Sequence, residues 1–225
     1  MRGPLRFVTH GRRVQRLAVR HGWRPGARYT NLRDIRESRF RRRGFLDIHW
    51  QQYSLAKHLH AVQVSHPLMT VARDIIRACD LERVLNEAEL LARYVPLVVV
   101  VPKDVRLADH LLTDIPAKFL LGYSVPSRYG GTLIPTGKFQ RPVHLLGGRP
   151  DSQRRLAEQM PVFSFDCNRF TLDAAYGDFF DGETFRPLAG GGYERCLKLS
   201  LQNINALWTT YRPPRHPQLE SLTTP

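Results

Sequence analysis

Polar side chains stand at or near the ends of five apolar runs in this chain of 225 residues: Asp47, Asp74, Lys103, Tyr123 and Asp166. If these runs are parallel strands of a barrel, their carboxyl ends meet on one rim, where such folds place their chemistry. Carboxylates at that rim can act as a nucleophile and as a general acid or base. One such residue alone is uninformative, and for Asp166 the alternative is an Asp that simply caps the following turn.

The clearest of these residues is Asp166. Residues 143–146 and 162–165 predict two strands, and residues 152–160 predict a helix between them. In such a βαβ unit the second strand ends by presenting Asp166 at the carboxyl side of the sheet. The glycine-containing turn after the first strand, Gly147-Gly148-Arg149-Pro150, is a candidate phosphate loop or simply a tight turn with Pro150 opening the helix.

The elements that must position these side chains alternate between strand and helix, which favours a parallel α/β architecture. Strands are predicted at 6–10, 45–50, 68–72, 95–101, 119–125, 143–146 and 162–165, and helices at 14–19, 31–40, 51–60, 74–92, 107–112, 152–160 and 196–211. We predict a compact (β/α)8 TIM-type barrel with its eighth strand within residues 20–40, although 21–28 reads as a loop because of Gly22, Pro25 and Gly26. A doubly wound open sheet is the alternative.

The expected organisation is one domain. Residues 1–44 form a basic segment with the first strand, residues 45–212 the barrel core with the active site and a C-terminal helix, and residues 213–225 a disordered tail.

The unit around Asp166 resembles the last two strands of the tRNA-guanine transglycosylase superfamily. The matching residues are Pro142 to Gly148 and Phe165-Asp166-Cys167. The whole chain looks closer to the DNA-guanine transglycosylases of phages, plasmids and actinobacteria, which put 7-deazaguanines into DNA. This impression comes from segments 45–50, 70–74, 98–104 and 121–126. The zinc site of the tRNA enzymes, Cys-x-Cys-x-x-Cys followed by His, has no counterpart in this sequence.

The resemblance implies a role for each rim residue. Asp166 is the expected nucleophile, and Asp47 the general acid/base carboxylate, although its Leu-Asp-Ile-His-Trp context lacks the glycines of the superfamily motif. Asp74 is expected to read the guanine N1–H and N2–H. Gly122, Tyr123 and Lys103 are expected beside the base. Arg73, Arg128 and Arg149 lie beside strand ends and are candidate contacts to the nucleic-acid backbone.

The net charge of +14 is concentrated at one end of the chain. Residues 1–43 hold fourteen Arg against Asp34 and Glu37, a balance of +12. Such a concentration is typical of polyanion binding, and Arg41, Arg42 and Arg43 are its densest run. The alternative is a solvated basic face that reflects arginine-rich codon usage.

Cysteine and histidine usage limits the other classes. Cys79, Cys167 and Cys196 are far apart without a CxxC pair, which favours a reducing, cytoplasmic setting. The histidines show no metal-binding spacing, so no metal is expected, and no cofactor is implied. No apolar run approaches the roughly 20 residues of a membrane span.

The expected function is therefore a pentosyltransferase that exchanges guanine in DNA for a free 7-deazaguanine base, with 7-cyano-7-deazaguanine favoured by the resemblance. A tRNA-directed enzyme, a barrel N-glycoside hydrolase and a non-catalytic nucleic-acid-binding protein remain the alternatives.

Overall fold

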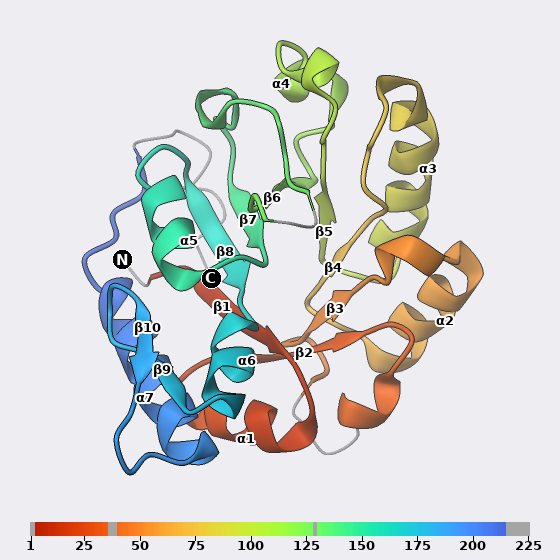
Figure 1. Cartoon of the computed structure of the whole chain (residues 1–225). Helices are drawn as coiled ribbons and strands as arrows, with labels where there is room; N and C mark the ends of the chain where they lie inside the picture. The colour runs from red at the N-terminus through yellow and green to blue at the C-terminus, as the bar shows by residue number, and fades with distance from the viewer. Residues whose placement is uncertain (1–2, 36–39, 128–129, 215–225) are drawn as a thin grey trace.

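The computed structural model describes residues 3–35, 40–127 and 130–214 and shows a closed eight-stranded parallel barrel surrounded by helices (Figure 1). The barrel strands are β1 (Leu5–Thr9), β2 (Arg24–Arg28), β3 (Phe45–Asp47), β4 (Met69–Val71), β5 (Leu97–Val100), β6 (Leu120–Ser124), β7 (Val143–Leu146) and β8 (Val162–Asp166). They pair in chain order, and β8 closes the barrel by pairing in parallel with β1. The prediction of a (β/α)8 barrel is confirmed.

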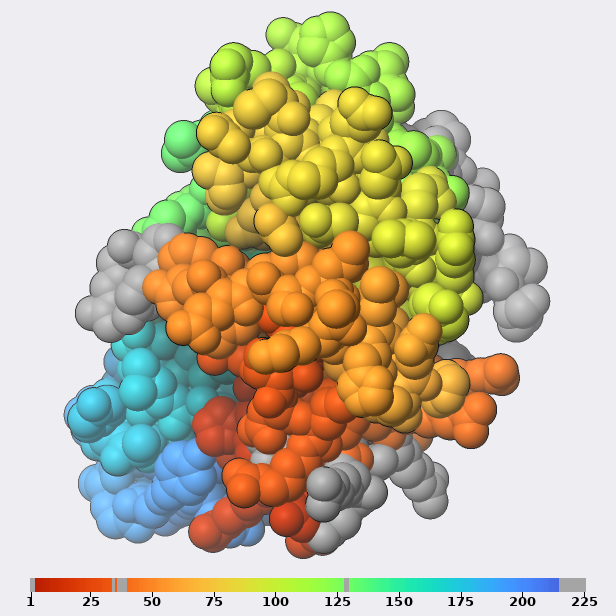
Figure 2. Space-filling model, turned by 90° about the vertical axis from the view of Figure 1, so that its right-hand side faces the viewer, coloured from red at the N-terminus to blue at the C-terminus, as the bar shows by residue number. Residues whose placement is uncertain are grey.

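The helices are α1 (Arg12–Arg20), α2 (Leu55–Ser65), α3 (Leu81–Ala92), α4 (Leu111–Asp114), α5 (Pro150–Leu156), α6 (Arg169–Ala175) and α7 (Tyr193–Leu207). Short 3-10 turns occur at Leu32–Ile35, Trp50–Gln52, Ala78–Asp80, Val105–Leu107 and Thr136–Lys138. Figure 2 shows the side that α2 (orange) and α3 (yellow) cover. An antiparallel hairpin of β9 (Asp178–Phe180) and β10 (Phe185–Pro187), which the sequence did not predict, lies beside α7 (Figure 1).

The eighth strand is β2, within the range where it was expected but inside the segment that reads as a loop. Gly26 is required there because a Cβ at this position would lie 2.4 Å from Thr9 Oγ1 and 3.0 Å from the backbone oxygen of Val8. The glycine that suggests a turn thus allows β1 and β2 to approach closely.

The prediction that a helix begins at Asp74 is wrong. Residues 74–77 are not helical; α3 begins at Leu81 after a 3-10 turn. Ile75 instead pairs in parallel with Pro102, and Lys103 N donates to Ile75 O at 3.0 Å. This extension of the β4–β5 ladder keeps Asp74 at the end of the barrel.

The inner layer of the barrel is built by side chains from five strands. The Phe7 ring lies 5.5 Å from that of Phe45, the Phe45 ring lies 4.9 Å from that of His144, and Ser164 Oγ lies 3.8 Å from Met69 Sδ. Because side chains alternate along a strand, the residues two positions after Phe45 and Ser164, which are Asp47 and Asp166, face the same interior one layer nearer the carboxyl end.

The outer face of β8 is fixed by aromatic packing. Phe165 stacks on Trp208 with ring centroids 4.6 Å apart and meets Trp23 edge-on at 5.6 Å. Asn205 in α7 accepts hydrogen bonds from Trp23 Nε1 at 2.8 Å and from an Arg6 guanidinium nitrogen at 2.7 Å. These contacts hold α7 against β1, β2 and β8, and so set the position of the strand that carries Asp166.

Within the basic segment expected at residues 1–44, residues 3–28 supply β1, α1 and β2 of the barrel itself. The predicted tail lies outside the described residues, except for 213 and 214. No helix in the described part of the chain is long and apolar enough to cross a membrane.

Candidate active site at the carboxyl end of the barrel

Asp166 ends β8 and is 5% exposed. Its Oδ1 accepts a hydrogen bond from Gly147 N at 3.0 Å, in a turn where Gly147 and Gly148 both have positive φ. Gln153 Nε2 ties this turn to the strand by donating to Gly147 O at 2.6 Å and to Asp166 O at 2.7 Å. Among the described residues no hydrogen bond reaches Oδ2. One carboxylate oxygen is therefore held, and the other is left for a ligand.

Asp47 ends β3, on a strand separated from β8 by β1 and β2. Its Oδ1 accepts from Ile48 N at 2.8 Å. Burial, followed by the charge of Asp166, raises the pKa of Asp47 to about 7, with a smaller contribution from Asp74 and opposition from Ile48 N and Arg28. Near neutral pH the carboxyl group can therefore both give and accept a proton.

Asp74 and Lys103 join the same rim. Lys103 Nζ lies 2.7 Å from Asp74 Oδ2, and the two side chains are only 21% and 15% exposed. Since the charge of Asp74 also reaches Asp47, the structure brings Asp47, Asp74, Lys103 and Asp166 together. Four of the five rim residues predicted from the sequence thus converge.

Tyr123 does not join them. It is 5% exposed, and its ring packs edge-on against Phe139 at 5.1 Å. Its neighbour Gly122 faces the interior, because a Cβ built there points at Val99, Val101 and Leu146. Side chains alternate along the strand, so Tyr123 points to the outer face. The expectation that this ring walls the base is therefore wrong.

Packing alone explains a glycine at position 122. In Gly122→Ala the new methyl carbon would lie 2.6 Å from Val101 Cγ2 and 2.8 Å from Val99 Cγ1. We expect overpacking to lower the free energy of unfolding by about 1–3 kcal/mol, measured by denaturant titration. Gly137→Ala is the matched control, since nothing lies within 4 Å of its added Cβ. Equal stability of the two variants would show that the inner layer relaxes freely.

Arg73 and Arg149, two of the arginines predicted to contact the nucleic-acid backbone, follow β4 and β7 at the carboxyl end of the barrel, where each contacts an acidic side chain and an aromatic ring. The Arg73 guanidinium carbon lies 4.5 Å from the centroid of the Tyr53 ring, and one nitrogen lies 3.5 Å from Glu87 Oε1. Arg149 Nε donates to Asp151 at 3.0 Å, and its guanidinium stacks on Phe185. Arg128 lies outside the described residues.

Arg41, Arg42 and Arg43 lie at the opposite end of the barrel. They form the turn before β3, and Arg42 N donates to His66 O, which precedes β4. The charge of Arg43 also reaches Arg24 at the start of β2 and lowers its pKa, after the larger effect of burial. Residues that precede parallel strands lie at their amino ends, so this run is remote from the carboxylates.

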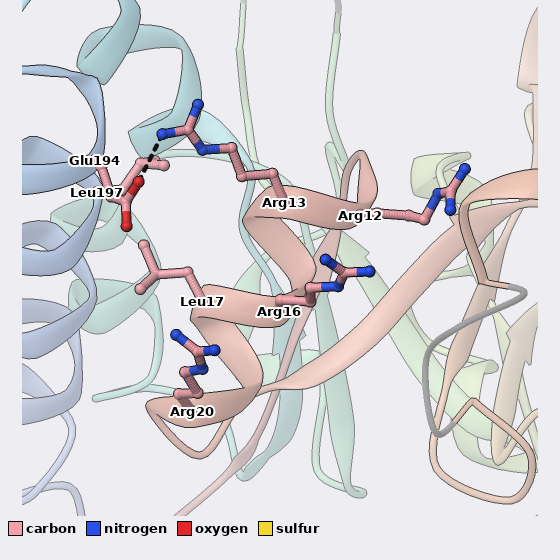
Figure 3. Close-up of a pocket in the computed structure, with 7 residues that line it drawn as sticks. All are labelled: Arg12, Arg13, Arg16, Leu17, Arg20, Glu194 and Leu197. Atoms are coloured by element: carbon pink, nitrogen blue, oxygen red, sulfur yellow. Dashed lines mark hydrogen bonds and ion pairs between the residues drawn. The ribbon is translucent and has the colours of Figure 1, made fainter.

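A different group of arginines lies on α1, on the carboxyl side of β1. Asn168, two residues after Asp166, accepts from Thr9 N at 2.9 Å, and α1 begins three residues after Thr9. A groove of about 450 Å³ between α1 and α7 is lined by Arg12, Arg13, Arg16, Leu17, Arg20, Glu194 and Leu197 (Figure 3). Figure 3 shows Arg13 reaching toward α7, where it pairs with Glu194 at 2.6 Å, whereas Arg12 and Arg16 extend to the other side of the helix.

Sequence reasoning missed the buried residues beneath the carboxylates. His144 and Ser164 are fully buried, with His144 Nδ1 2.8 Å from Ser164 Oγ and Nε2 3.6 Å from Asp166 Oδ1. One signal for Ser164 was available in the sequence. Ser164 stands two positions before Asp166, and alternation along a strand places both side chains on the same face. Cys167 next to Asp166 is a packed thiol, and burial raises its pKa to about 12.

Among the described residues, no three His, Cys, Asp or Glu side chains lie close enough together to hold a metal ion.

A protein-family model described as "Family of unknown function (DUF6610)" matches residues 18–209, which span β2 to α7 and contain all four converging rim residues. The chain belongs to this family. No curated protein matches its sequence.

Among solved structures, this DUF6610 chain is similar to the YdjI aldolase from Escherichia coli K12. The TM-score is 0.53, with 93% of this chain and 92% of that chain covered and 9% sequence identity. At this identity the similarity concerns the barrel fold.

Proposed function

We propose that this protein is a pentosyltransferase that exchanges guanine in DNA for a free 7-deazaguanine base through a covalent bond between Asp166 and the sugar. The observation that carries the proposal is the pair of carboxyl groups at the rim. Asp166 has one oxygen held by Gly147 N and the other without a partner among the described residues, while Asp47 has its pKa raised to about 7. A fixed nucleophile and a proton carrier are what base exchange requires.

In the first half of the reaction Asp166 Oδ2 attacks C1′ of the deoxyribose. The bond from C1′ to guanine N9 breaks, its electron pair stays on the base, and protonated Asp47 gives the proton that neutralises the leaving guanine. In the second half the incoming 7-deazaguanine gives its ring N–H proton to Asp47, and its nitrogen attacks C1′. Asp166 then leaves as a carboxylate, and both acids have returned to their starting states.

Asp74 and Lys103 suit recognition of the base in this scheme. An Asp74 carboxylate can accept from both N1–H and N2–H of guanine, which an analogue without these donors cannot satisfy. Lys103 Nζ, 2.7 Å from Asp74 Oδ2, fixes the orientation of this carboxylate. Gly122 remains a proposed contact to the base carbonyl, although the side chains of Val99, Val101 and Leu146 lie against its inner side.

The arginines of α1 support a polyanionic substrate more directly than Arg41–Arg43. Arg12, Arg16 and Arg20 recur every four residues along the helix and are exposed, and α1 starts beside the strand end that carries Asp166. A nucleic-acid strand entering the barrel mouth would meet α1 before it reached the opposite end.

Replacing Arg12, Arg16 and Arg20 together by Gln should therefore weaken DNA binding and flatten its salt dependence by about one unit of log–log slope for each phosphate that is no longer neutralised. Fluorescence anisotropy of labelled DNA at several salt concentrations measures this slope. The matched control replaces Arg41, Arg42 and Arg43 by Gln, which removes the same charge. A larger effect from the control would place the nucleic acid at the amino end and contradict this path.

Two other functions use the same rim. A hydrolase would let water resolve the Asp166 intermediate, and a tRNA enzyme would use the same chemistry on RNA. The deciding experiment incubates the protein with DNA or with tRNA, with and without 7-cyano-7-deazaguanine, followed by mass spectrometry of the nucleosides. We expect the deazaguanosine only in DNA, with release of an equal amount of guanine. Guanine release without incorporation would identify the hydrolase, and no change in either nucleic acid would contradict both transferases.

A further inference from the structure

His144 lies beneath Asp166 inside the barrel, and the scheme above does not use it. Its side chain is fully buried, its ring packs 4.9 Å from that of Phe45, and Nδ1 lies 2.8 Å from Ser164 Oγ. Nε2 points toward Asp166, 3.6 Å from Oδ1, and has no hydrogen-bond partner among the described residues. Whether this buried nitrogen carries a hydrogen decides whether it attracts or repels the carboxylate.

The Ser164 hydroxyl restricts which ring nitrogen of His144 carries the hydrogen, because the hydroxyl group has only one hydrogen to donate. Its oxygen lies near both His144 Nδ1 and, at 3.8 Å, Met69 Sδ. If the hydrogen points at the weak sulfur acceptor, Nδ1 must carry the imidazole hydrogen and Nε2 presents a lone pair to Asp166 Oδ1. Two lone pairs would then face each other in a buried site, which is costly. If the hydroxyl donates to Nδ1 instead, Nε2 carries the hydrogen and points it at the carboxylate.

We propose that His144 is a positioning residue for Asp166, held by Ser164 with hydrogen on Nε2. In this arrangement Oδ1 is held by two donors, Gly147 N–H and His144 Nε2–H, and the attacking lone pairs are confined to Oδ2. The separation of 3.6 Å exceeds a hydrogen bond, and such contacts tighten when a site is occupied. When Oδ2 is bonded to the sugar, Oδ1 becomes a carbonyl oxygen, and the same donors stabilise the charge that returns as the sugar leaves.

The proton position can be tested without any substrate. Imidazole nitrogen NMR of the full-length protein at neutral pH should show His144 as the tautomer protonated on Nε2. In Ser164→Ala, which removes the hydroxyl donor, this tautomer should lose its preference. Hydrogen on Nδ1 in the wild-type protein would overturn the proposal.

The role in positioning rests on the proposed function and is tested by activity. His144→Leu removes the donor, whereas His144→Gln keeps an amide N–H on a side chain of similar reach. We expect kcat of base exchange to fall roughly 10- to 100-fold in His144→Leu, with KM for the incoming base nearly unchanged and a substantial part of kcat restored in His144→Gln. Equal activity of the Leu and Gln variants would contradict the role.

His58 offers a matched control for the loss of a buried imidazole. It is also fully buried, its Nε2 donates to Thr70 Oγ1 at 2.7 Å because that hydroxyl donates to Leu46 O, and burial lowers its pKa to about 4. His58→Leu should lower the melting temperature and leave kcat unchanged; an equal loss of kcat would assign the effect at His144 to packing. If the Nε2 tautomer is found but no nucleic acid is modified, the proposed function fails while the placement of the Nε2 hydrogen toward Asp166 stands.

Discussion

Asp166→Asn should abolish both base exchange and covalent trapping of the sugar. An amide oxygen is a far poorer nucleophile than a carboxylate oxygen, so we expect exchange to fall by at least about 10⁴-fold. Wild-type protein mixed with target DNA and no incoming base should give an adduct stable on a denaturing gel, and the variant should give none. The fold should survive, because the Asn oxygen can still accept from Gly147 N, as Oδ1 does at 3.0 Å.

Asp109→Asn is a suitable control because that carboxylate is exposed and pairs only with Lys138 at 2.6 Å among the described residues. It should form the adduct at the wild-type rate. Exchange by Asp166→Asn at the wild-type rate would remove the nucleophile from the proposed mechanism, and with it the reason to place this chain among the transglycosylases.

Asp47→Asn should slow exchange by roughly 10²–10⁴-fold while DNA affinity is retained. The pKa raised to about 7 also gives a pH signature. Adduct formation needs the protonated acid, so the wild-type rate should fall as the pH rises through about 7. Asn cannot titrate, so the slow rate of the variant should lack this alkaline decline. Single-turnover adduct formation between about pH 5 and 9 measures both, and an unchanged decline in the variant would assign that titration to another group.

The same pKa makes a prediction about stability. A carboxyl group whose folded pKa lies above its ordinary value of 3.8 favours the folded state when protonated, and that contribution is lost as the pH rises through about 7. Asp47→Asn should therefore raise the melting temperature relative to the wild type at about pH 8 and have less effect at about pH 5. A difference independent of pH would show that Asp47 has an ordinary carboxyl pKa.

The strands that carry Asp47, Asp74, Lys103 and Asp166 were predictable because apolar runs such as Val98–Val99–Val100 are typical of strands buried on both faces. Their convergence followed from the barrel prediction alone.

The barrel strand that the sequence did not predict, β2, was missed for a physical reason. Arg24–Arg28 reads as a loop because Pro25 and Gly26 favour turns, and only the close approach of β1 explains Gly26.

The position of His144 could not be deduced in the same way. Alternation places Ser164 on the face of Asp166, but the pairing of His144 with Ser164 depends on the register between β7 and β8, which contains an irregularity at residues 143 and 144. The location of the arginines in the fold could not be deduced for a similar reason. Charge counted along the chain does not distinguish the helix beside the mouth from the turn at the opposite end.

The closure of the barrel has a consequence for how the protein is made. β1 is synthesised well before β8, yet one of its edges pairs with β8, through Leu5 with Ser164 and Phe7 with Asp166. Until β8 is available, that edge presents unpaired peptide groups and an apolar strand, which favours association between nascent chains. Folding must bring together segments about 160 residues apart, a separation that slows the final step. We therefore expect recombinant yield to depend more on temperature and chaperone supply than on stability after folding.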